Sequence, residues 1–550
     1  MSKIIIISSP PWGIVMPPLG MAYLATYLKS KGIVPEIYDL NLQLYEQADQ
    51  QQEHFWDLDT INKFLPVDIA HNLFAAFEDT LGDVVKKLVN YDIVGFSANN
   101  LISTTFAGIM GTQIKNISPK TKIILGGPGC FHSWDRKAVP KDAVDFFIIG
   151  EGEEALYRLI MAIDEGDEQR EIPGVICCAA GDRKRFYPPE PVKNLDVIPF
   201  PTFEEFDVSK YSYGKKYRPL PMLTSRGCIN QCAYCIDCYM SAPFRARSPE
   251  QVVSQISYYK KHYGITHVEF NDLLCNGNLI RLEKLCDQLI EAELNINWIS
   301  YAAIRRKMNS QLLEKMRKAG CTSLCFGVES GSDSVLARMN KHYIRAEASA
   351  LLKKTHEAGI TARLNLIVGF PGETEENFQQ TLDFIKDNMA SISQVTNVSS
   401  FVLMPGSDIG IYPYRFGVKF LDPLDPGIWT DEFGLTQQER NNRVARACRL
   451  LEELNIPNLI INYQSKTQDA RLKTQDSRLK TQDSRPKTQD ARPKTQDAKL
   501  KTQVVVRTFN RDRLVSKIIK LIFLFVFSLI IDIYLFLLKK IRGSIIFPGN

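Results

Sequence analysis

The stretch that decides the fold is Ser225-Arg226-Gly227-Cys228-Ile229-Asn230-Gln231-Cys232-Ala233-Tyr234-Cys235. Its cysteines have the spacing CxxxCxxC and follow an apolar segment, Met222 to Ser225, that favours a strand. Three thiolates from one loop can each bind one iron of a cubane and leave the fourth iron open, and such clusters select soft sulfur ligands. We therefore predict a 4Fe-4S cluster on Cys228, Cys232 and Cys235.

A structural zinc site is the alternative for the same cysteines. Such a site uses four closed ligands, and Cys238 could supply the fourth, because Cys235 to Cys238 is itself a CxxC pair. A three-thiolate cluster instead leaves one iron open. A small molecule could bind that iron and be reduced directly by the cluster. The position of the loop, directly after a strand, favours the cluster.

The loop opens a series of six apolar runs, and five of them clearly precede an amphipathic helix. Six such units are two short of a closed eight-stranded barrel, so the pattern predicts a partial (β/α)6 TIM barrel over residues 216–440, with a helical extension over 441–465. Catalytic groups are then expected at the carboxyl ends of the strands. The expected strands are Met222 to Ser225, His267 to Asn271, Trp298 to Ala302, Ser323 to Glu329, Arg363 to Gly369 and Ser399 to Met404.

Residues 1–180 alternate short apolar runs with helical stretches, which predicts a Rossmann-like, doubly wound parallel sheet. Several runs end in glycine or other turn-forming residues, where open α/β sheets bind ligands. Residues 181–215 are rich in proline and charge and predict a surface connector. The expected strands are Ile4 to Ser8, Pro35 to Leu40, Ile93 to Ala98, Lys122 to Gly127, Val144 to Gly150 and Val175 to Ala179.

The C-terminal part of the chain is of another kind. Lys-Thr-Gln-Asp recurs every seven residues over 466–503, and Pro486 and Pro493 oppose a coiled coil, so we predict a disordered linker. Within residues 515–540, the run Leu521 to Leu538 has one charge, Asp532, and is just long enough to span a bilayer. It predicts a transmembrane or interfacial helix that tethers the chain. A tail whose reading frame the repeat expansion has altered is the alternative.

Residues 215–410 resemble the radical S-adenosylmethionine (SAM) superfamily. Beyond the cysteine loop, the resemblance rests on Glu269 to Asp272, Gly327 to Ser332 and Asn365 to Glu373, which occur in the family's order. It implies that the cluster binds and cleaves SAM to a 5′-deoxyadenosyl radical. By resemblance, Tyr234 lies beside the adenine, Glu329 and Ser330 meet the methionine or ribose part, and the strand around Leu366 and Gly369 flanks the adenine.

The N-terminal domain resembles the cobalamin-binding modules that precede such barrels. The residues that carry the resemblance, and that we expect to bind cobalamin, are Leu19, Gly20, Ser97, Gly126, Gly127, Gly150 and Glu151. The Asp-x-His-x-x-Gly loop of other cobalamin proteins is missing, and the first histidine of the chain is His54. No histidine after the first strand can therefore bind cobalt from below. A vestigial domain that binds no cobalamin is the alternative.

Composition limits the partners and the compartment. A net charge of +5 with 23% charged residues gives no electrostatic case for nucleic acid. The twelve cysteines come without a secretory signal, because Met1-Ser2-Lys3 leads directly into an apolar strand. We therefore expect a cytoplasmic protein, anchored to the inner face of the membrane if the C-terminal helix inserts.

The resemblance implies methyl transfer from methylcobalamin to an unactivated carbon, with electrons from a reducing donor such as flavodoxin or ferredoxin. A cobalamin-dependent cyclase or rearrangement enzyme shares both cofactors and is the nearest alternative. A non-catalytic iron–sulfur electron carrier or sensor is the alternative of another class, although a carrier needs no SAM pocket. The apolar tail hints at a lipid-like rather than another small-molecule substrate. The sequence identifies no catalytic side chain.

Overall fold

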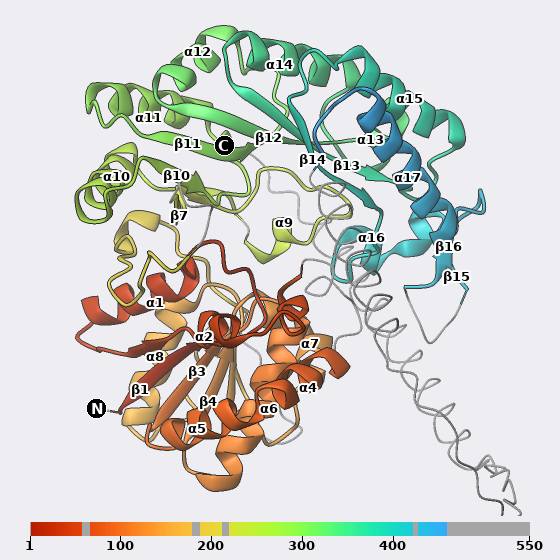
Figure 1. Cartoon of the computed structure of the whole chain (residues 1–550). Coiled ribbons are helices and arrows are strands. Elements are labelled where there is room, and N and C mark those ends of the chain that lie inside the picture. The colour runs from red at the N-terminus through yellow and green to blue at the C-terminus, as the bar shows by residue number, and fades with distance from the viewer. Residues whose placement is uncertain are drawn as a thin grey trace, which may run out of the picture. The chain divides into compact units, whose positions relative to one another are not determined.

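The computed structural model describes residues 2–57, 67–178, 188–211, 219–241, 243–421 and 427–458 (Figure 1). The chain divides into two compact units, and the first, Met1–Lys473, contains every helix and strand given below. The second unit, Thr474–Asn550, lies outside the described residues, as do the whole repeat linker, residues 466–503, and the apolar run Leu521 to Leu538.

The N-terminal sheet has six strands in the order β2-β1-β3-β4-β5-β6. The first five are parallel, as the doubly wound pattern predicts. The strands are β1 (Ile4–Ser8), β2 (Glu36–Tyr38), β3 (Ile93–Ser97), β4 (Lys122–Gly126), β5 (Phe146–Ile148) and β6 (Val175–Cys177). The helices are α1 (Leu19–Ser30), α2 (Leu40–Gln47), α4 (Val67–Ala76), α5 (Glu78–Leu88), α6 (Leu101–Ile117), α7 (Ser133–Lys137) and α8 (Gly152–Asp164), with short 3-10 helices at Glu53–Trp56 and Pro128–Cys130.

Helices cover both faces of this sheet. Ile4 and Ile6 of β1 belong to one core cluster together with α1 and α8, whereas Ile5 and Ile7 belong to a second cluster together with α5 and α6. Because successive side chains of a strand point to opposite faces, a strand that is buried on both sides needs an unbroken apolar run. The four consecutive isoleucines of β1 meet that need.

The prediction of a wholly parallel sheet is wrong at its last strand. β6 runs antiparallel to β5, with Val175 opposite Ile148 and Cys177 opposite Phe146. After α8 the chain returns along residues 165–174 to the carboxyl end of β5, where the Ile149 amide donates to the Gly174 carbonyl. The strand therefore starts from the opposite edge to its neighbours.

The second sheet is fully parallel and open, in the order β14-β13-β12-β11-β10-β7. This confirms the partial barrel of six strands. The strands are β7 (Leu220–Met222), β10 (His267–Phe270), β11 (Asn297–Ala302), β12 (Cys321–Glu329), β13 (Thr361–Val368) and β14 (Gln394–Ser400). The helices that cover its outer face in Figure 1 are α10 (Pro249–Tyr263), α11 (Leu279–Glu291), α12 (Ser310–Lys318), α14 (Arg345–Glu357) and α15 (Glu375–Asp387), and the short α13 (Asp333–Arg338) follows β12.

Local sequence signals set the ends of these helices. Ser248 caps α10 by accepting a hydrogen bond from the Gln251 amide, Pro249 occupies the first turn, and Gly264 ends the helix in the left-handed conformation. Thr374 caps α15 in the same way, through the Asn377 amide. Each cap fixes the point at which a strand-end loop becomes a helix, which in turn fixes the loop.

The last strand and helix of the barrel differ from the prediction. β14 begins five residues before the expected Ser399, because Val395 and Val398 supply its buried side, while Phe401 packs in a separate apolar cluster with Val335 and Phe370. Helix α17 (Gln437–Glu453) begins before the expected boundary at residue 441. It packs on β13 and β14 and so forms part of the barrel.

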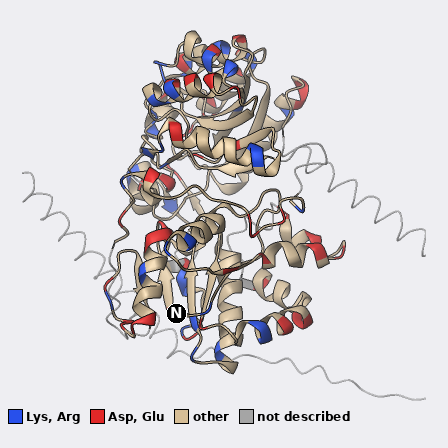
Figure 2. Cartoon of the chain, turned by 90° about the vertical axis from the view of Figure 1, so that its left-hand side faces the viewer, with Lys and Arg blue, Asp and Glu red and all other residues tan. Residues whose placement is uncertain are grey.

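Charged residues of both signs are interspersed along the outer helices in Figure 2. Among the residues that the structure describes, no helix is both long enough and apolar enough to cross a bilayer. The predicted membrane helix lies outside those residues, so it stays a prediction.

Candidate functional site

The cysteine loop extends from a two-stranded antiparallel ribbon. β8 (Ser225–Arg226) pairs with β9 (Arg245–Ala246), and residues 227–244, including the short helix α9 (Asp237–Met240), connect them. Gly227 begins the loop with a φ of 85°, and a Cβ there would lie 2.4 Å from the Ser241 carbonyl oxygen. Only glycine fits this left-handed, crowded position, so it fixes the direction in which the chain leaves the ribbon.

Cys228, Cys232 and Cys235 lie in one loop close enough to influence one another electrostatically. Burial raises the pKa of the Cys228 and Cys232 thiols, while the charge of Lys341 acts in the opposite direction. Among the described residues, no three His, Cys, Asp or Glu side chains already have the geometry of a metal site. The donor set nevertheless fits an iron–sulfur cluster, since three thiols and a nearby cation favour thiolate ligands.

Cys238 differs from the other three cysteines of the loop. Its Sγ donates to the Cys235 carbonyl oxygen at 3.2 Å, and the side chain is buried. A hydrogen bond from Cys238 lowers the pKa of Cys235 and raises that of Cys238 itself. Cys238 is therefore held by the backbone of Cys235, in surroundings that favour the protonated form of its own thiol.

Tyr234 and Glu329, both predicted to contact SAM, contact each other. The Tyr234 hydroxyl donates to Glu329 Oε1 at 2.9 Å, and Lys341 Nζ donates to the same oxygen at 3.2 Å. Burial would lower the pKa of Lys341, but its pairing with Glu329 raises it. Glu329 also has a φ of 65°, which is strained for a residue with a side chain and is typical of functional strand ends. The cysteine loop is thus joined to the end of β12.

Two other predicted SAM contacts, Ser330 and Leu366, are buried against neighbouring elements of the barrel. Ser330 is buried and its hydroxyl lies 3.1 Å from the Thr381 hydroxyl of α15, so it stabilises the turn after β12. The Leu366 side chain packs in the core between the sheet and the helices. Any contact from Leu366 to a cofactor would therefore come from its backbone.

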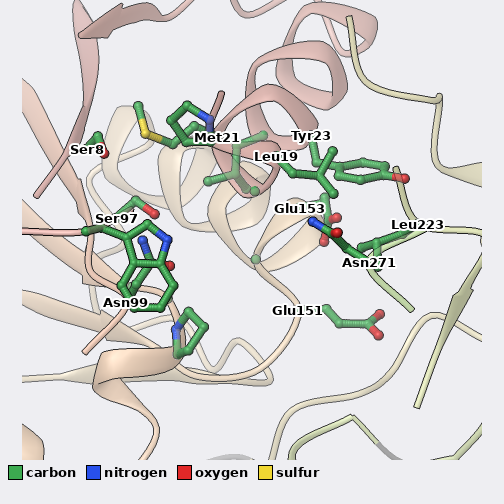
Figure 3. A pocket seen from close by; sticks show the side chains of 18 of the residues that line it. Ser8, Leu19, Met21, Tyr23, Ser97, Asn99, Glu151, Glu153, Leu223 and Asn271 are labelled. Carbon is green, nitrogen blue, oxygen red and sulfur yellow. The ribbon is translucent and has the colours of Figure 1, made fainter. Parts of the chain in front are cut away.

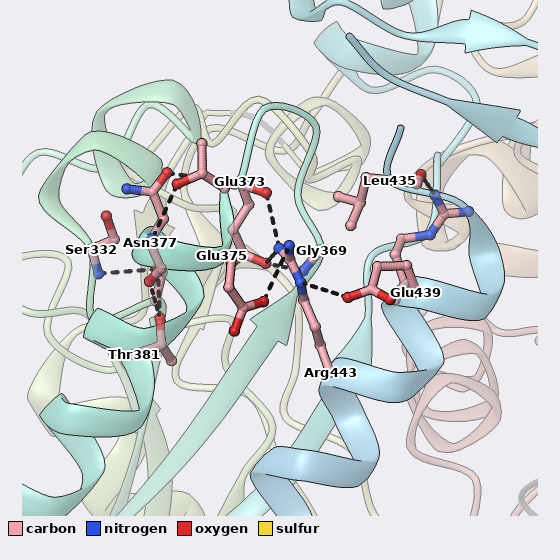
Figure 4. A network of polar contacts seen from close by, with 12 residues as sticks. Ser332, Gly369, Glu373, Glu375, Asn377, Thr381, Leu435, Glu439 and Arg443 are labelled. Carbon is pink, nitrogen blue, oxygen red and sulfur yellow. Dashed lines mark hydrogen bonds and ion pairs between the residues drawn. The ribbon is translucent and has the colours of Figure 1, made fainter. Parts of the chain in front are cut away.

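Gly369 is held by a buried carboxylate (Figure 4). Glu373 Oε2 accepts from the Gly369 amide at 2.6 Å and from Arg443 Nη1 at 2.7 Å, and Glu373 has no exposed surface. Burial raises the pKa of Glu373 and the adjacent guanidinium opposes that change. A Cβ on Gly369 would lie 2.5 Å from Arg440 Cγ. Helix α17 therefore fixes the loop after β13.

A cavity of about 600 Å³ lies where the carboxyl ends of β1, β3, β4 and β5 face the base of the cysteine loop (Figure 3). The barrel contributes Leu223, Ser225 to Gly227 and Asn271 to its wall. None of the predicted SAM contacts lines it. All the residues predicted to bind cobalamin do: Leu19, Gly20, Ser97, Gly126, Gly127, Gly150 and Glu151.

The walls of this cavity fit a corrin. A Cβ on Gly20 would meet no atom within 4 Å, and one on Gly126 would meet only Ile148, at 3.6 Å, so the missing side chains leave room for a macrocycle. Trp12 and Met21 add apolar surface, and the lining of the cavity contains no histidine and no cysteine. The described lining therefore offers cobalt no imidazole or thiolate ligand.

Comparison with known families identifies both domains. Residues 222–385 match the model of the radical SAM superfamily, and residues 12–160 match that of the B12 binding domain. The chain therefore joins a B12 binding domain to a radical SAM domain. Its cofactors are a 4Fe-4S cluster, SAM and cobalamin, as the two domains imply.

Three curated relatives of this radical SAM enzyme are similar over most of its length. An uncharacterized methyltransferase of Pyrococcus horikoshii is 27% identical over 73% of this chain and 79% of its own. An anaerobic magnesium-protoporphyrin IX monomethyl ester cyclase of Rubrivivax gelatinosus is 25% identical over 68% and 62%. Cytidylyl-2-hydroxyethylphosphonate methyltransferase of Streptomyces wedmorensis is 22% identical over 76% and 83%.

Two solved radical SAM proteins share the fold. The methyltransferase TsrM from Kitasatospora setae, with tryptophan and a SAM analogue bound, is 18% identical with a TM-score of 0.58 over 82% of this chain and 89% of its own. OxsB with aqua-cobalamin bound is 18% identical with a TM-score of 0.56 over 76% and 56%. At these identities the likeness shows that the architecture is common to all three.

No sequence pattern indicates the residues that support the site from a distance. Arg440 and Arg443 are buried, yet they lie in a helix rich in charged residues, where arginine usually faces water. No sequence pattern indicates Lys341 either. Its partner Glu329 lies on the preceding strand, too far along the chain for a helical or strand spacing to connect them. Only a three-dimensional contact distinguishes these cations from surface residues.

Single substitution of Cys228, Cys232 or Cys235 by alanine is expected to abolish the brown chromophore and 5′-deoxyadenosine formation after anaerobic reconstitution, because a site-differentiated cubane needs all three thiolates. Cys238→Ala is the matched control from the same loop and should retain both. Iron analysis and product chromatography measure the two properties. Loss of iron in Cys238→Ala equal to that in the other variants would contradict the three-ligand site.

Glu373→Gln should destabilise the barrel by about 3–5 kcal/mol, because it removes the buried counter-charge of Arg443, whose other acidic partners, Glu375 and Glu439, are farther away and more exposed. Glu375→Gln is the control, since Glu375 pairs with the same arginine at 3.8 Å but its side chain is 56% exposed. Its cost should be about 1 kcal/mol or less. Urea denaturation followed by circular dichroism gives both values, and equal small costs would show that Glu373 does not anchor the loop.

Proposed function

We propose that this radical SAM enzyme methylates an unactivated carbon of a small molecule, with cobalamin as the methyl carrier. One observation carries the proposal: the cavity that fits a corrin and the loop that fits the cluster share a wall, formed by Ser225, Arg226 and Gly227. Two sites that adjoin can act on one substrate in turn. Two of the three relatives that are similar over most of the chain are methyltransferases, which supports the same reaction.

The residues of this chain have distinct tasks in that reaction. When bound, the cluster with SAM supplies a radical that removes a hydrogen atom, and cobalamin supplies the methyl group. The three loop cysteines would hold the cluster as thiolates. Lys341 and Tyr234 hold the Glu329 carboxylate at the end of β12. Glu373 and Arg443 hold the loop that begins at Gly369, so neither loop has to reorganise when a ligand arrives.

The cobalamin cavity is lined by several apolar side chains. Trp12, Met21, Leu223 and Leu273 line it, so most of its surface is apolar. The described lining contains neither histidine nor cysteine, so the protein would offer bound cobalamin no imidazole or thiolate ligand. A cobalamin held in that way would supply the electron-rich cobalt that methyl transfer from SAM needs.

The partners and the location are further parts of the proposal. Electrons would come from a flavodoxin or ferredoxin in the cytoplasm, where the reducing environment suits a chain that needs free thiolates at Cys228, Cys232 and Cys235. The tail around Leu521 to Leu538 would tether the enzyme to the membrane and bring it near a lipid-like substrate. That segment lies outside the described residues, so the tether rests on the sequence alone.

Methyl transfer from SAM to cobalamin can be tested without knowing the substrate. Wild-type protein reconstituted with cobalamin, reduced, and given SAM with a labelled methyl group should form bound labelled methylcobalamin and one equivalent of S-adenosylhomocysteine. Gly20→Leu should fold normally but bind no cobalamin, because the new side chain fills the cavity and meets no protein atom at Cβ. Gly82→Leu is the control, since Gly82 is also helical, also meets nothing within 4 Å, and does not line the cavity.

The outcomes separate the parts of the proposal. Normal cobalamin binding by Gly20→Leu would show that the cavity is not the corrin site. Bound cobalamin that never acquires the label would exclude a methyltransferase and favour the cyclase or rearrangement reaction. Failure to bind any corrinoid would indicate a vestigial domain.

A further inference from the structure

The acidic stretch Gly150-Glu151-Gly152-Glu153, at the start of α8, contacts the ribbon that carries the cysteine loop. Glu153 Oε1 pairs with Arg226 Nη2 at 2.5 Å. Glu151 pairs with both ribbon arginines, at 2.7 Å to Arg245 and 3.4 Å to Arg226. Figure 3 shows both glutamates on the wall of the cavity. The cobalamin domain thus reaches the cluster domain through two carboxylates.

These charges are removed from water. The side chains of Arg226, Arg245 and Glu153 are 12%, 7% and 6% exposed, and that of Glu151 is 17% exposed. Burial would raise the pKa of Glu153, yet the Arg226 guanidinium keeps it below its ordinary value. A buried charge is tolerated only when it is paired, so each arginine depends on its glutamate.

The ribbon places two arginines side by side, and the glutamates neutralise them. Arg226 and Arg245 lie directly opposite each other in the register of β8 and β9. Like charges at opposed positions of an antiparallel pair repel and destabilise it. Because Glu151 touches both arginines, it converts this repulsion into a bridge between the two strands.

Arg245 carries the contact into the loop. Its remaining donors reach the carbonyl oxygens of Pro243 at 2.9 Å and Ser241 at 3.1 Å. Those two carbonyls are also the atoms against which Gly227 packs, directly before Cys228. A continuous set of contacts therefore runs from Glu151 through Arg245 to the start of the cysteine loop.

We propose that Glu151 and Glu153 are positioning residues for the iron–sulfur cluster: by neutralising Arg226 and Arg245 they hold the ribbon closed, so that the cysteine loop takes its ligating conformation only against the docked cobalamin domain. The inference rests on the proposed function, since it presupposes the cluster. It gives the cobalamin domain a second task beside binding its cofactor. Assembly of the cluster then depends on both domains.

A purely local role for the glutamates is the competing explanation. Acidic residues in the first turn of a helix stabilise it through the helix dipole, whatever lies opposite. Such a role would affect the stability of α8 and would leave the cluster unchanged in protein that has folded. The experiment must therefore examine the cluster itself.

The test uses the full chain, reconstituted anaerobically with iron, sulfide and cobalamin. Glu153→Gln and Glu151→Gln remove one charge each, and Glu154→Gln is the control, because Glu154 is the next residue of the same helix turn but is exposed and bonds only to Tyr27. Iron and cobalamin per chain are measured, together with the electron paramagnetic resonance (EPR) spectrum of the reduced cluster before and after SAM is added. Glu151→Gln decides the matter if Glu153→Gln does not fold.

Iron per chain should fall roughly tenfold or more in both variants because a buried arginine has lost its partner, and in Glu153→Gln the loss of iron should exceed any loss of cobalamin. The residual cluster should no longer change its EPR spectrum when SAM is added, whereas Glu154→Gln behaves as wild type. Wild-type iron content and a wild-type response to SAM in Glu151→Gln and Glu153→Gln would overturn the inference. A wild-type chain that assembles no cluster would instead refute the proposed function.

Discussion

The carboxyl ends of parallel strands lie at the same edge of a sheet. In this chain that edge of the N-terminal sheet and the loops at that edge of the barrel sheet line one cavity. The loops after β1, β3, β4 and β5 line the cavity, and the ribbon after β7 completes its wall. Side chains of distant origin, such as Leu19 and Arg226, meet there because strand direction brings them together. The adjacency of the two cofactor sites follows from this constraint.

Buried ion pairs set the strand-end loops within that frame. Glu329 with Lys341, Glu373 with Arg443, and Glu153 with Arg226 each join the end or the flank of a strand to an element formed elsewhere in the chain. Apolar packing alone would leave such loops free to shift, since hydrophobic contacts have no direction. A buried pair admits few geometries, so it fixes the backbone on which a cofactor would rest. Taking the two charges of each pair out of water costs free energy, but the pair then holds its loop in one position.

Features that local patterns determine could be predicted from the sequence. Features that depend on residues far apart in the chain could not. The CxxxCxxC spacing, the glycines at the strand ends and the alternation of strands and helices indicated both domains and the open barrel. The direction of β6 depends on a ten-residue return that has no periodicity of its own. The alternation of polar and apolar residues along β13 places Leu366 on the buried apolar face with Leu364 and Val368, whereas the family resemblance led us to expect that strand beside the adenine. The partners of Glu151 lie 75 and 94 residues farther along the chain, at Arg226 and Arg245, where no spacing rule reaches.

The central claim, that the cluster and cobalamin occupy adjoining sites across one wall, is tested most directly by their magnetic interaction. Wild-type protein that contains both cob(II)alamin and the one-electron-reduced cluster is examined by low-temperature EPR beside samples that contain either cofactor alone. Adjoining sites predict that the cobalt signal is split or broadened and relaxes faster when the cluster is reduced. A spectrum equal to the sum of the two separate signals would contradict the claim.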